Sequence, residues 1–150
     1  MSGLVKIAKA QLRQAKSRLR DAEEALNDEN YPYCLRLSQE CVELSLKASL
    51  KLVGIEYPKI HDVSEVLISV KGRFPEWFKK EIEEMGEASK ILASKREVAL
   101  YGSEEEYLTP EEVIGNKEAK DALEKARKVY QLCEKLLSLY INGQKSRNFK

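Results

Sequence analysis

The chain has 150 residues, of which 43% are hydrophobic and 34% charged, and its formal net charge at pH 7 is +1. This length allows one domain with a sizeable core, and the near-zero charge excludes a global positive field for nucleic acid. Charged residues interrupt every apolar window before membrane-spanning length, and the first residues lack the apolar core of a signal peptide. We therefore expect one helical domain over 1–150 with no membrane partner.

The cysteines indicate a reducing compartment. There are three of them, an odd number, and each lies within a helical pattern: Cys34, Cys41 and Cys133. This usage favours free thiols and a cytoplasmic protein. With no CxxC pair and one histidine, the sequence predicts neither a metal site nor a cofactor.

The first expected helix covers residues 3–28 and carries a basic row beside its apolar row. The basic row comprises Lys6, Lys9, Arg13, Lys16 and Arg20. Positive charge near a helix N-terminus opposes the macrodipole, so helix stability does not require this row. Two interpretations stay open: a solvated face, which is the more common case, or a surface that binds phosphate.

The next segment, 33–53, has the most apolar helical pattern of the chain. Asn30 is expected to cap it and Gly54 to end it. Its polar residues form a narrow row, which we call the polar strip: Arg36, Glu40, Glu43, Lys47 and Lys51. A helix that is apolar around most of its circumference must be covered on most sides. We therefore expect it to be the most buried helix of a bundle.

Sequence patterns for shorter elements follow the central segment. His61 precedes Asp62 and Glu65, whose spacing predicts a capping box and a short helix. A lone histidine is more often structural than catalytic, so backbone bonding or packing is the expected role of His61. A turn at 71–73 and Pro75 then predict one helix from 75 to about 100.

The last third of the chain predicts a short helical turn over 109–115 and a long helix over 116–142. Residues 144–150 are expected to form a flexible tail. No alternating strand pattern occurs anywhere in the sequence. The fold class is therefore all-α, an up-and-down bundle of four to five main helices.

The order of four motifs resembles the HEPN family, the higher eukaryote and prokaryote nucleotide-binding domain. The second helix has the pattern QxxxExxxKA from Gln39 to Ala48, and a connector with Gly54, Pro58 and His61–Asp62 follows it. The third long helix ends in RxxAxYG from Arg96 to Gly102. The approach to the last helix supplies the fourth part: Tyr107, Thr109, Glu111 and Glu112, then Ala122 and Ala126.

The resemblance implies a helical bundle that dimerises and that accompanies a minimal nucleotidyltransferase, in many members as part of a toxin–antitoxin pair. Ribonuclease members of the family carry Arg-x4–6-His late in the fold. Here Arg96 is followed five positions later by Tyr101, and no histidine occurs after His61. A phenol with a pKa near 10 is a poor general base at neutral pH, so the sequence leans away from an enzyme.

Three functions remain open from the sequence. The first is a non-catalytic protein that binds nucleotide or RNA phosphate, with Arg96 on phosphate, Tyr101 on a base or phosphate, and Lys47 adding charge. The second is a metal-independent ribonuclease toxin that pairs Arg96 with Tyr101 or with His61. The third is a structural dimer or scaffold without ligand, in which Arg96 and Lys47 make ordinary ion pairs with glutamates.

Overall fold

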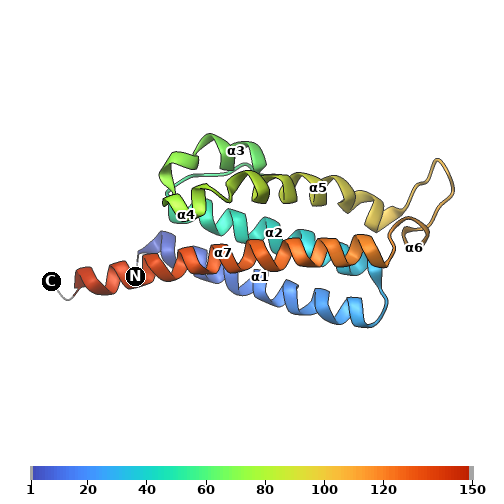
Figure 1. The fold of residues 1–150 in the computed structure, drawn as a ribbon, viewed down its shortest axis with the longest axis horizontal. Coiled ribbons are helices and arrows are strands. Elements are labelled where there is room, and N and C mark those ends of the chain that lie inside the picture. Colours follow the sequence, from blue (N-terminus) through green and yellow to red (C-terminus); the bar gives the residue numbers. More distant parts are fainter. Residues whose placement is uncertain (1, 149–150) are drawn as a thin grey trace.

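The computed structural model describes the backbone of residues 2–148 and the side chains of residues 2–143. Four long helices run alternately up and down: α1 (Gly3–Asn27), α2 (Tyr31–Leu52), α5 (Ile82–Tyr101) and α7 (Asn116–Asn148). Short elements connect them: α3 (Ser64–Ser69), η1 (Lys71–Arg73), α4 (Glu76–Lys79) and α6 (Pro110–Val113). The predicted all-α bundle is confirmed (Figure 1).

Helix α2 is the most deeply buried helix of the described bundle, as its narrow polar strip predicts. It packs against α1, α5 and α7, and the buried residues on it include Ser38, Gln39, Ser45 and Ser49 as well as its apolar rows. Gly54 follows its end with φ of 76°, a conformation that glycine adopts without strain. Asn30 occupies the N-cap position as predicted, but its side chain makes no hydrogen bond to the first turn of the helix.

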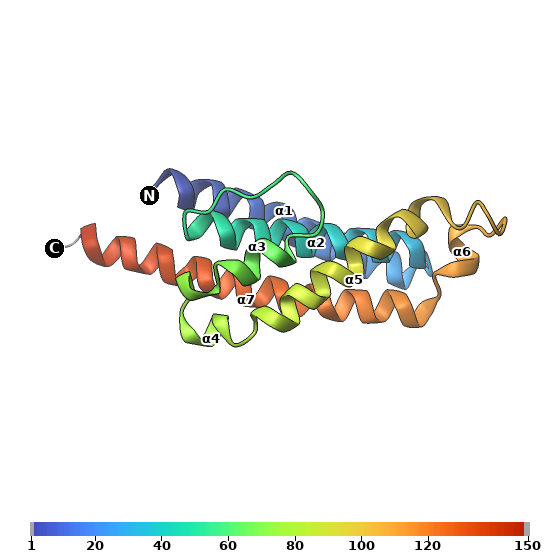
Figure 2. The same cartoon turned by 90° about the horizontal axis from the view of Figure 1, so that it is seen from above.

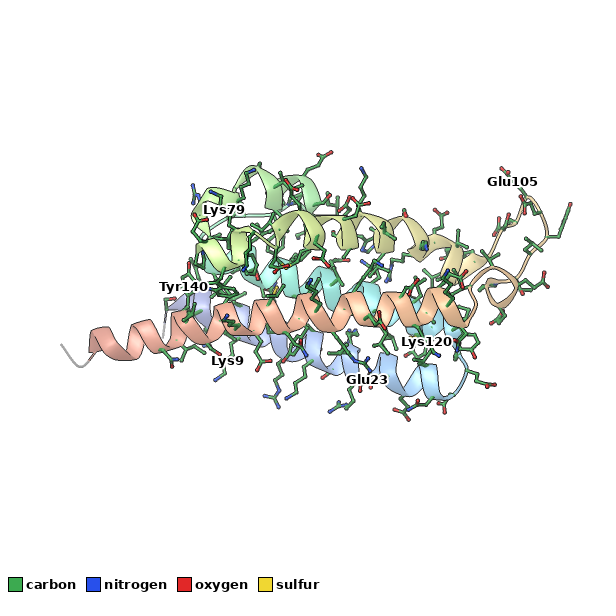
Figure 3. The ribbon with its side chains drawn as sticks, viewed as in Figure 1. Lys9, Glu23, Lys79, Glu105, Lys120 and Tyr140 are labelled. Atoms are coloured by element: carbon green, nitrogen blue, oxygen red, sulfur yellow. The ribbon has the colours of Figure 1, made fainter. Side chains whose placement is uncertain are left out.

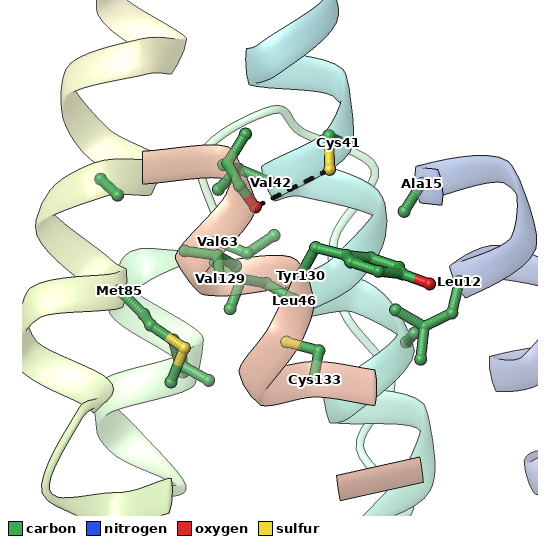
Figure 4. Packing of buried hydrophobic residues seen from close by; sticks show 14 of the residues in the cluster. Leu12, Ala15, Cys41, Val42, Leu46, Val63, Met85, Val129, Tyr130 and Cys133 are labelled. Atoms are coloured by element: carbon green, nitrogen blue, oxygen red, sulfur yellow. Dashed lines mark hydrogen bonds between the residues drawn. The ribbon is translucent and has the colours of Figure 1, made fainter. Parts of the chain in front are cut away.

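The contact between α2 and α7 is apolar and tightly packed. Figure 4 shows Tyr130 of α7 pointing toward Leu12 and Ala15 of α1, with Cys41 of α2 donating to a carbonyl of α7. The three cysteines are free and buried. Burial raises the pKa of the Cys41 thiol to about 12, which keeps it protonated and unreactive. No helix in the described residues is long and apolar enough to cross a membrane.

Two helices differ from the sequence prediction. The expected helix over 75–100 is broken at Lys80 and Glu81 into α4 and α5, which lie at an angle to each other (Figure 2). Lys80 stands at the C-cap of α4 and Glu81 at the N-cap of α5, and Phe78 and Ile82 on either side of the break are both fully buried. Helix α7 continues through Gly143 to Asn148, beyond the expected end at 142, and residues 149–150 of the expected tail lie outside the described residues.

A short loop joins α5 to α6 at the end of the bundle farthest from both termini, where Figure 3 labels Glu105. The backbones of Ser103 and Leu108 exchange two hydrogen bonds of 2.9 Å across it. Gly102 has φ of 67°, and a Cβ there would lie 2.1 Å from the carbonyl oxygen of Leu108. Only glycine fits this position, so the glycine of the RxxAxYG pattern has a structural reason.

Candidate functional site

A charged network follows the polar strip of α2, and its partners come from α1, α5 and the connector 53–63. The strip lies along a helix that is otherwise buried, so its charged side chains are only partly exposed to water. The carboxylates of Glu40 and Glu43 are 24% and 17% exposed. In such an environment each charge acts more strongly on its neighbours than it would in bulk water.

The carboxylate of Glu40 forms ion pairs with three arginines, which come from α1, α2 and α5. Arg18 of α1 donates from Nε to Oε1 at 2.9 Å, and Arg96 of α5 donates from Nη1 to Oε2 at 2.9 Å. Arg36 of α2 places its Nε 3.6 Å from Oε2, an ion pair beyond hydrogen-bond distance. Partial burial raises the pKa of Glu40, but the hydrogen bonds from Arg96 and Arg18 outweigh it and hold this pKa below its ordinary value.

Glu43 forms the second centre of the network, one turn along α2. Lys47 Nζ lies 2.8 Å from Oε2, and His61 Nδ1 lies 2.7 Å from Oε1. The pairing of Lys47 with Glu43 is the one its helical spacing predicts, whereas His61 pairs with a side chain and not with backbone. Burial raises the pKa of Glu43, and hydrogen bonds from Lys47, Gln39 and His61 more than offset this, so the pKa is lowered.

Gln39 joins the two centres. Its side-chain oxygen accepts from Arg96 Nη1 at 2.9 Å, and its Nε2 donates to Glu43 Oε1 at 2.9 Å. Gln39 is 2% exposed, so its position is fixed by packing as well as by these bonds. Arg96 of α5 and His61 of the connector are therefore linked through Gln39 and Glu43, although 35 positions separate them in the sequence.

The connector 53–63 is held over the polar strip by contacts with α1, α2 and α5. The ring of Tyr57 lies under the ammonium groups of Lys47 and Lys51, at 5.4 and 5.1 Å from its centroid, and Gln11 of α1 donates to its hydroxyl. Asp62 accepts from the hydroxyl of Ser89 in α5 at 2.8 Å and from the backbone of Ser64 at 2.9 Å. The bond to Ser64 replaces the predicted capping box, since α3 has no side-chain cap.

Positive charge exceeds negative charge in this network. Four cationic side chains, Arg18, Arg36, Lys47 and Arg96, pair with the two carboxylates, and His61 adds a further positive charge when protonated. Lys51 adds a fifth cation over the ring of Tyr57. Arg96 uses Nη1 for both of its described bonds. The remaining guanidinium nitrogens give the network hydrogen-bond donors for an anion.

The structure brings together some of the predicted site residues and separates others. Arg96, Lys47 and His61 join one network, while Tyr101 lies at the end of α5, 63% exposed and outside it. The basic row of α1 is exposed along its whole length, and Lys9 points away from the bundle in Figure 3. The sequence analysis did not select Arg18, Gln39 or Tyr57 as site residues. Gln39 belongs to the QxxxExxxKA pattern, whereas Arg18 and Tyr57 belong to no motif that was recognised.

Comparisons with known proteins identify one family and its fold. The model of the HEPN domain family matches residues 8–136. The crystal structure of TT1696 from Thermus thermophilus is similar, with 23% identity and a TM-score of 0.66 over 85% of this chain and 96% of that one. ST0689, described as an archaeal HEPN homologue, has 21% identity and a TM-score of 0.64 over 87% and 97%. No curated protein matches.

Proposed function

This chain belongs to the HEPN domain family, and from this premise we propose that it binds the phosphate groups of nucleotide or RNA along the polar strip without cleaving them. The observation that carries the proposal is the excess of cations around Glu40 and Glu43. An anion that entered the strip would balance this excess, and the partial burial of the site would strengthen the attraction. Guanidinium groups are the side chains best suited to hold phosphate by paired hydrogen bonds.

Arg96 is the central residue of the proposal. Gln39 and Glu40 hold its Nη1, so the guanidinium is already oriented before a ligand arrives. A group held in its binding geometry loses little entropy when it binds, which favours affinity. Lys47 contributes charge, and the exposed ring of Tyr101 offers a stacking surface for a base beyond the strip. The basic row of α1 contributes a weaker, salt-sensitive attraction.

The residue at position 101 supports binding without cleavage. Tyr101 stands where ribonuclease members of the family have histidine, and it is far too weak a base at neutral pH. By analogy with the family, we also propose that the chain forms a homodimer and pairs with a minimal nucleotidyltransferase in a toxin–antitoxin-type system. Sedimentation as a monomer at high micromolar concentration would contradict the dimer.

The test is a titration of the protein with labelled nucleotide and with short single-stranded RNA at low salt. Arg96→Ala should weaken binding about tenfold or more, because it removes charge-assisted hydrogen bonds. Arg13→Gln is the matched control, since it removes one arginine from the exposed row, and it should weaken binding only slightly. Flat titrations of the wild type would refute the binding function and leave the scaffold alternative.

One observation favours a second candidate, the metal-independent ribonuclease. Glu43 holds Nδ1 of His61 at 2.7 Å, and the same carboxylate is linked through Gln39 to Arg96. A carboxylate that fixes one imidazole nitrogen leaves the other to accept a proton, as in many acid–base sites. RNA cleavage by metal-free wild-type protein that disappears in both His61→Asn and Arg96→Ala would support this candidate over binding alone.

A further inference from the structure

A cavity of about 410 Å³ lies where the start of α2, the end of α5 and the start of α6 meet, at the end of the bundle opposite the termini (Figure 1). Tyr33, Arg36, Leu100 and Glu111 are among the residues that line it. Its volume is within the range of small-molecule sites and exceeds what an inorganic anion requires. The cavity adjoins the polar strip, because Arg36 belongs to both.

Arg36 is the cation whose ion pair in the network is too long for a hydrogen bond. Its guanidinium lies over the ring of Tyr33 at 4.9 Å from the centroid. Its Nε is buried and has no hydrogen-bond partner in the described residues, since Glu40 is 3.6 Å away and already accepts from Arg18 and Arg96. The Nε is enclosed by the protein, so a ligand in the cavity would meet Arg36 through its terminal guanidinium nitrogens, for which no hydrogen bond is described.

The first turn of α2 adds positive potential on the same side. Asn30 lines the cavity and gives no side-chain hydrogen bond to this turn, so the N–H groups of Tyr31 and Tyr33 are not capped by it. Uncapped N–H groups and the helix macrodipole favour a negative charge at this end of α2. Of these groups, Tyr33 lines the cavity together with Arg36, so this wall combines the positive end of α2 with one guanidinium.

We propose that this cavity binds a terminal phosphate monoester, either of a free nucleoside monophosphate or of an RNA end. The inference rests on the proposed phosphate-binding function and specifies where a chain end or mononucleotide would sit. A monoester presents three terminal oxygens and a charge of about −1.5 to −2 at pH 7, whereas a diester presents two oxygens and a single charge. The cluster of donors and positive charge around Arg36 therefore prefers the monoester.

A substitution at Glu111 should change the affinity for a monoester in the opposite direction to a substitution at Arg36. Glu111 lines the α6 side of the cavity, and its negative charge repels a dianion. Glu111→Gln should therefore tighten monoester binding, whereas Arg36→Gln should weaken it. A purely structural role of the two residues would not make their effects on binding opposite in sign.

The experiment compares four ligands with the full chain: AMP, cyclic AMP, and one short RNA with either a 5′-phosphate or a 5′-hydroxyl. The monoesters, AMP and the 5′-phosphorylated RNA, should bind about tenfold more tightly than their counterparts. Arg36→Gln should abolish this preference, and it should weaken the binding of 5′-hydroxyl RNA less than that of 5′-phosphorylated RNA, because the former loses only one charge of the polar strip. Arg36→Lys keeps the charge and should retain part of the preference, and Arg13→Gln is the control for general charge.

The outcomes separate this inference from the proposed function. Binding of 5′-hydroxyl RNA with no preference for either monoester would refute the monoester site in the cavity. It would remain consistent with phosphate binding along the polar strip. A preference for AMP alone would assign the cavity to mononucleotides, and a preference for phosphorylated RNA alone would assign it to chain ends. If none of the four ligands bound, both proposals would be refuted.

Discussion

The two cationic regions of this molecule look alike in the sequence but differ in their surroundings. The five side chains of the basic row of α1 are exposed to solvent, and Lys9 points away from the bundle (Figure 3). The polar strip of α2 is lined by side chains from three segments and is held by short ion pairs to Glu40 and Glu43. Exposed charges act through a screened field, whereas oriented and partly buried ones act through geometry. The strip therefore suits specific recognition and the row suits general attraction.

The largest expected effect comes from removing the carboxylate that three arginines share. Glu40→Gln should lower the free energy of unfolding by about 2 kcal/mol, because it leaves Arg18 and Arg96 partly buried without their negative partner. Glu24→Gln on the exposed surface of α1 is the control and should change stability by less than about 0.5 kcal/mol. Urea unfolding at pH 7 measures the change in unfolding free energy of both variants. Equal changes would contradict the claim that the polar strip is held by stronger ion pairs than the exposed surface of α1.

A smaller effect on stability is expected when Glu43 becomes protonated at acidic pH. Its pKa is lower in the folded protein than in the unfolded chain, so the stability that it contributes is present above its unfolded pKa of about 4.3. That contribution is lost as the pH falls through the folded pKa. The difference in unfolding free energy between wild type and Glu43→Gln should therefore begin to shrink as the pH falls to about 4.3, and it should continue to shrink as the pH falls further through the folded pKa. A difference that stayed constant as the pH fell would contradict the role of the ionised carboxylate.

Much of the fold followed from the sequence because the helical periodicity was strong. The burial of α2 and the end of that helix at Gly54 were predicted from pattern alone. The break at Lys80–Glu81 was not predicted, because the apolar periodicity continues across it: Phe78 and Ile82 are four positions apart, which is also the spacing on one face of a continuous helix. The helix starts were predicted in part: Asn30 stands at the N-cap without a side-chain bond, and Asp62 accepts from Ser64 at the start of α3 but also from Ser89 of α5, a tertiary partner that local spacing does not reveal.

The site was predicted in part. Arg96, Lys47 and His61 were selected from motifs, yet their connection depends on Gln39, a polar residue that the sequence places on the buried side of the strip. Arg18 belongs to the same helix as the basic row, but its position on the helix turns it toward Glu40 and away from that row. Local spacing identifies charged faces, and only the packing of three segments decides which of those charges become paired.

The smallest effect on stability, and the most informative one on binding, is expected at the basic row itself. Arg13→Gln together with Lys16→Gln should change the unfolding free energy by less than about 0.5 kcal/mol, since both side chains are exposed. The slope of log affinity for single-stranded RNA against log salt should flatten by about 0.7 for each phosphate that the protein no longer neutralises. Arg96→Ala should reduce affinity with a smaller change of slope, because a held guanidinium contributes hydrogen bonds as well as charge. Equal slopes for the two variants, measured at several salt concentrations, would mean that both regions act only as diffuse charge.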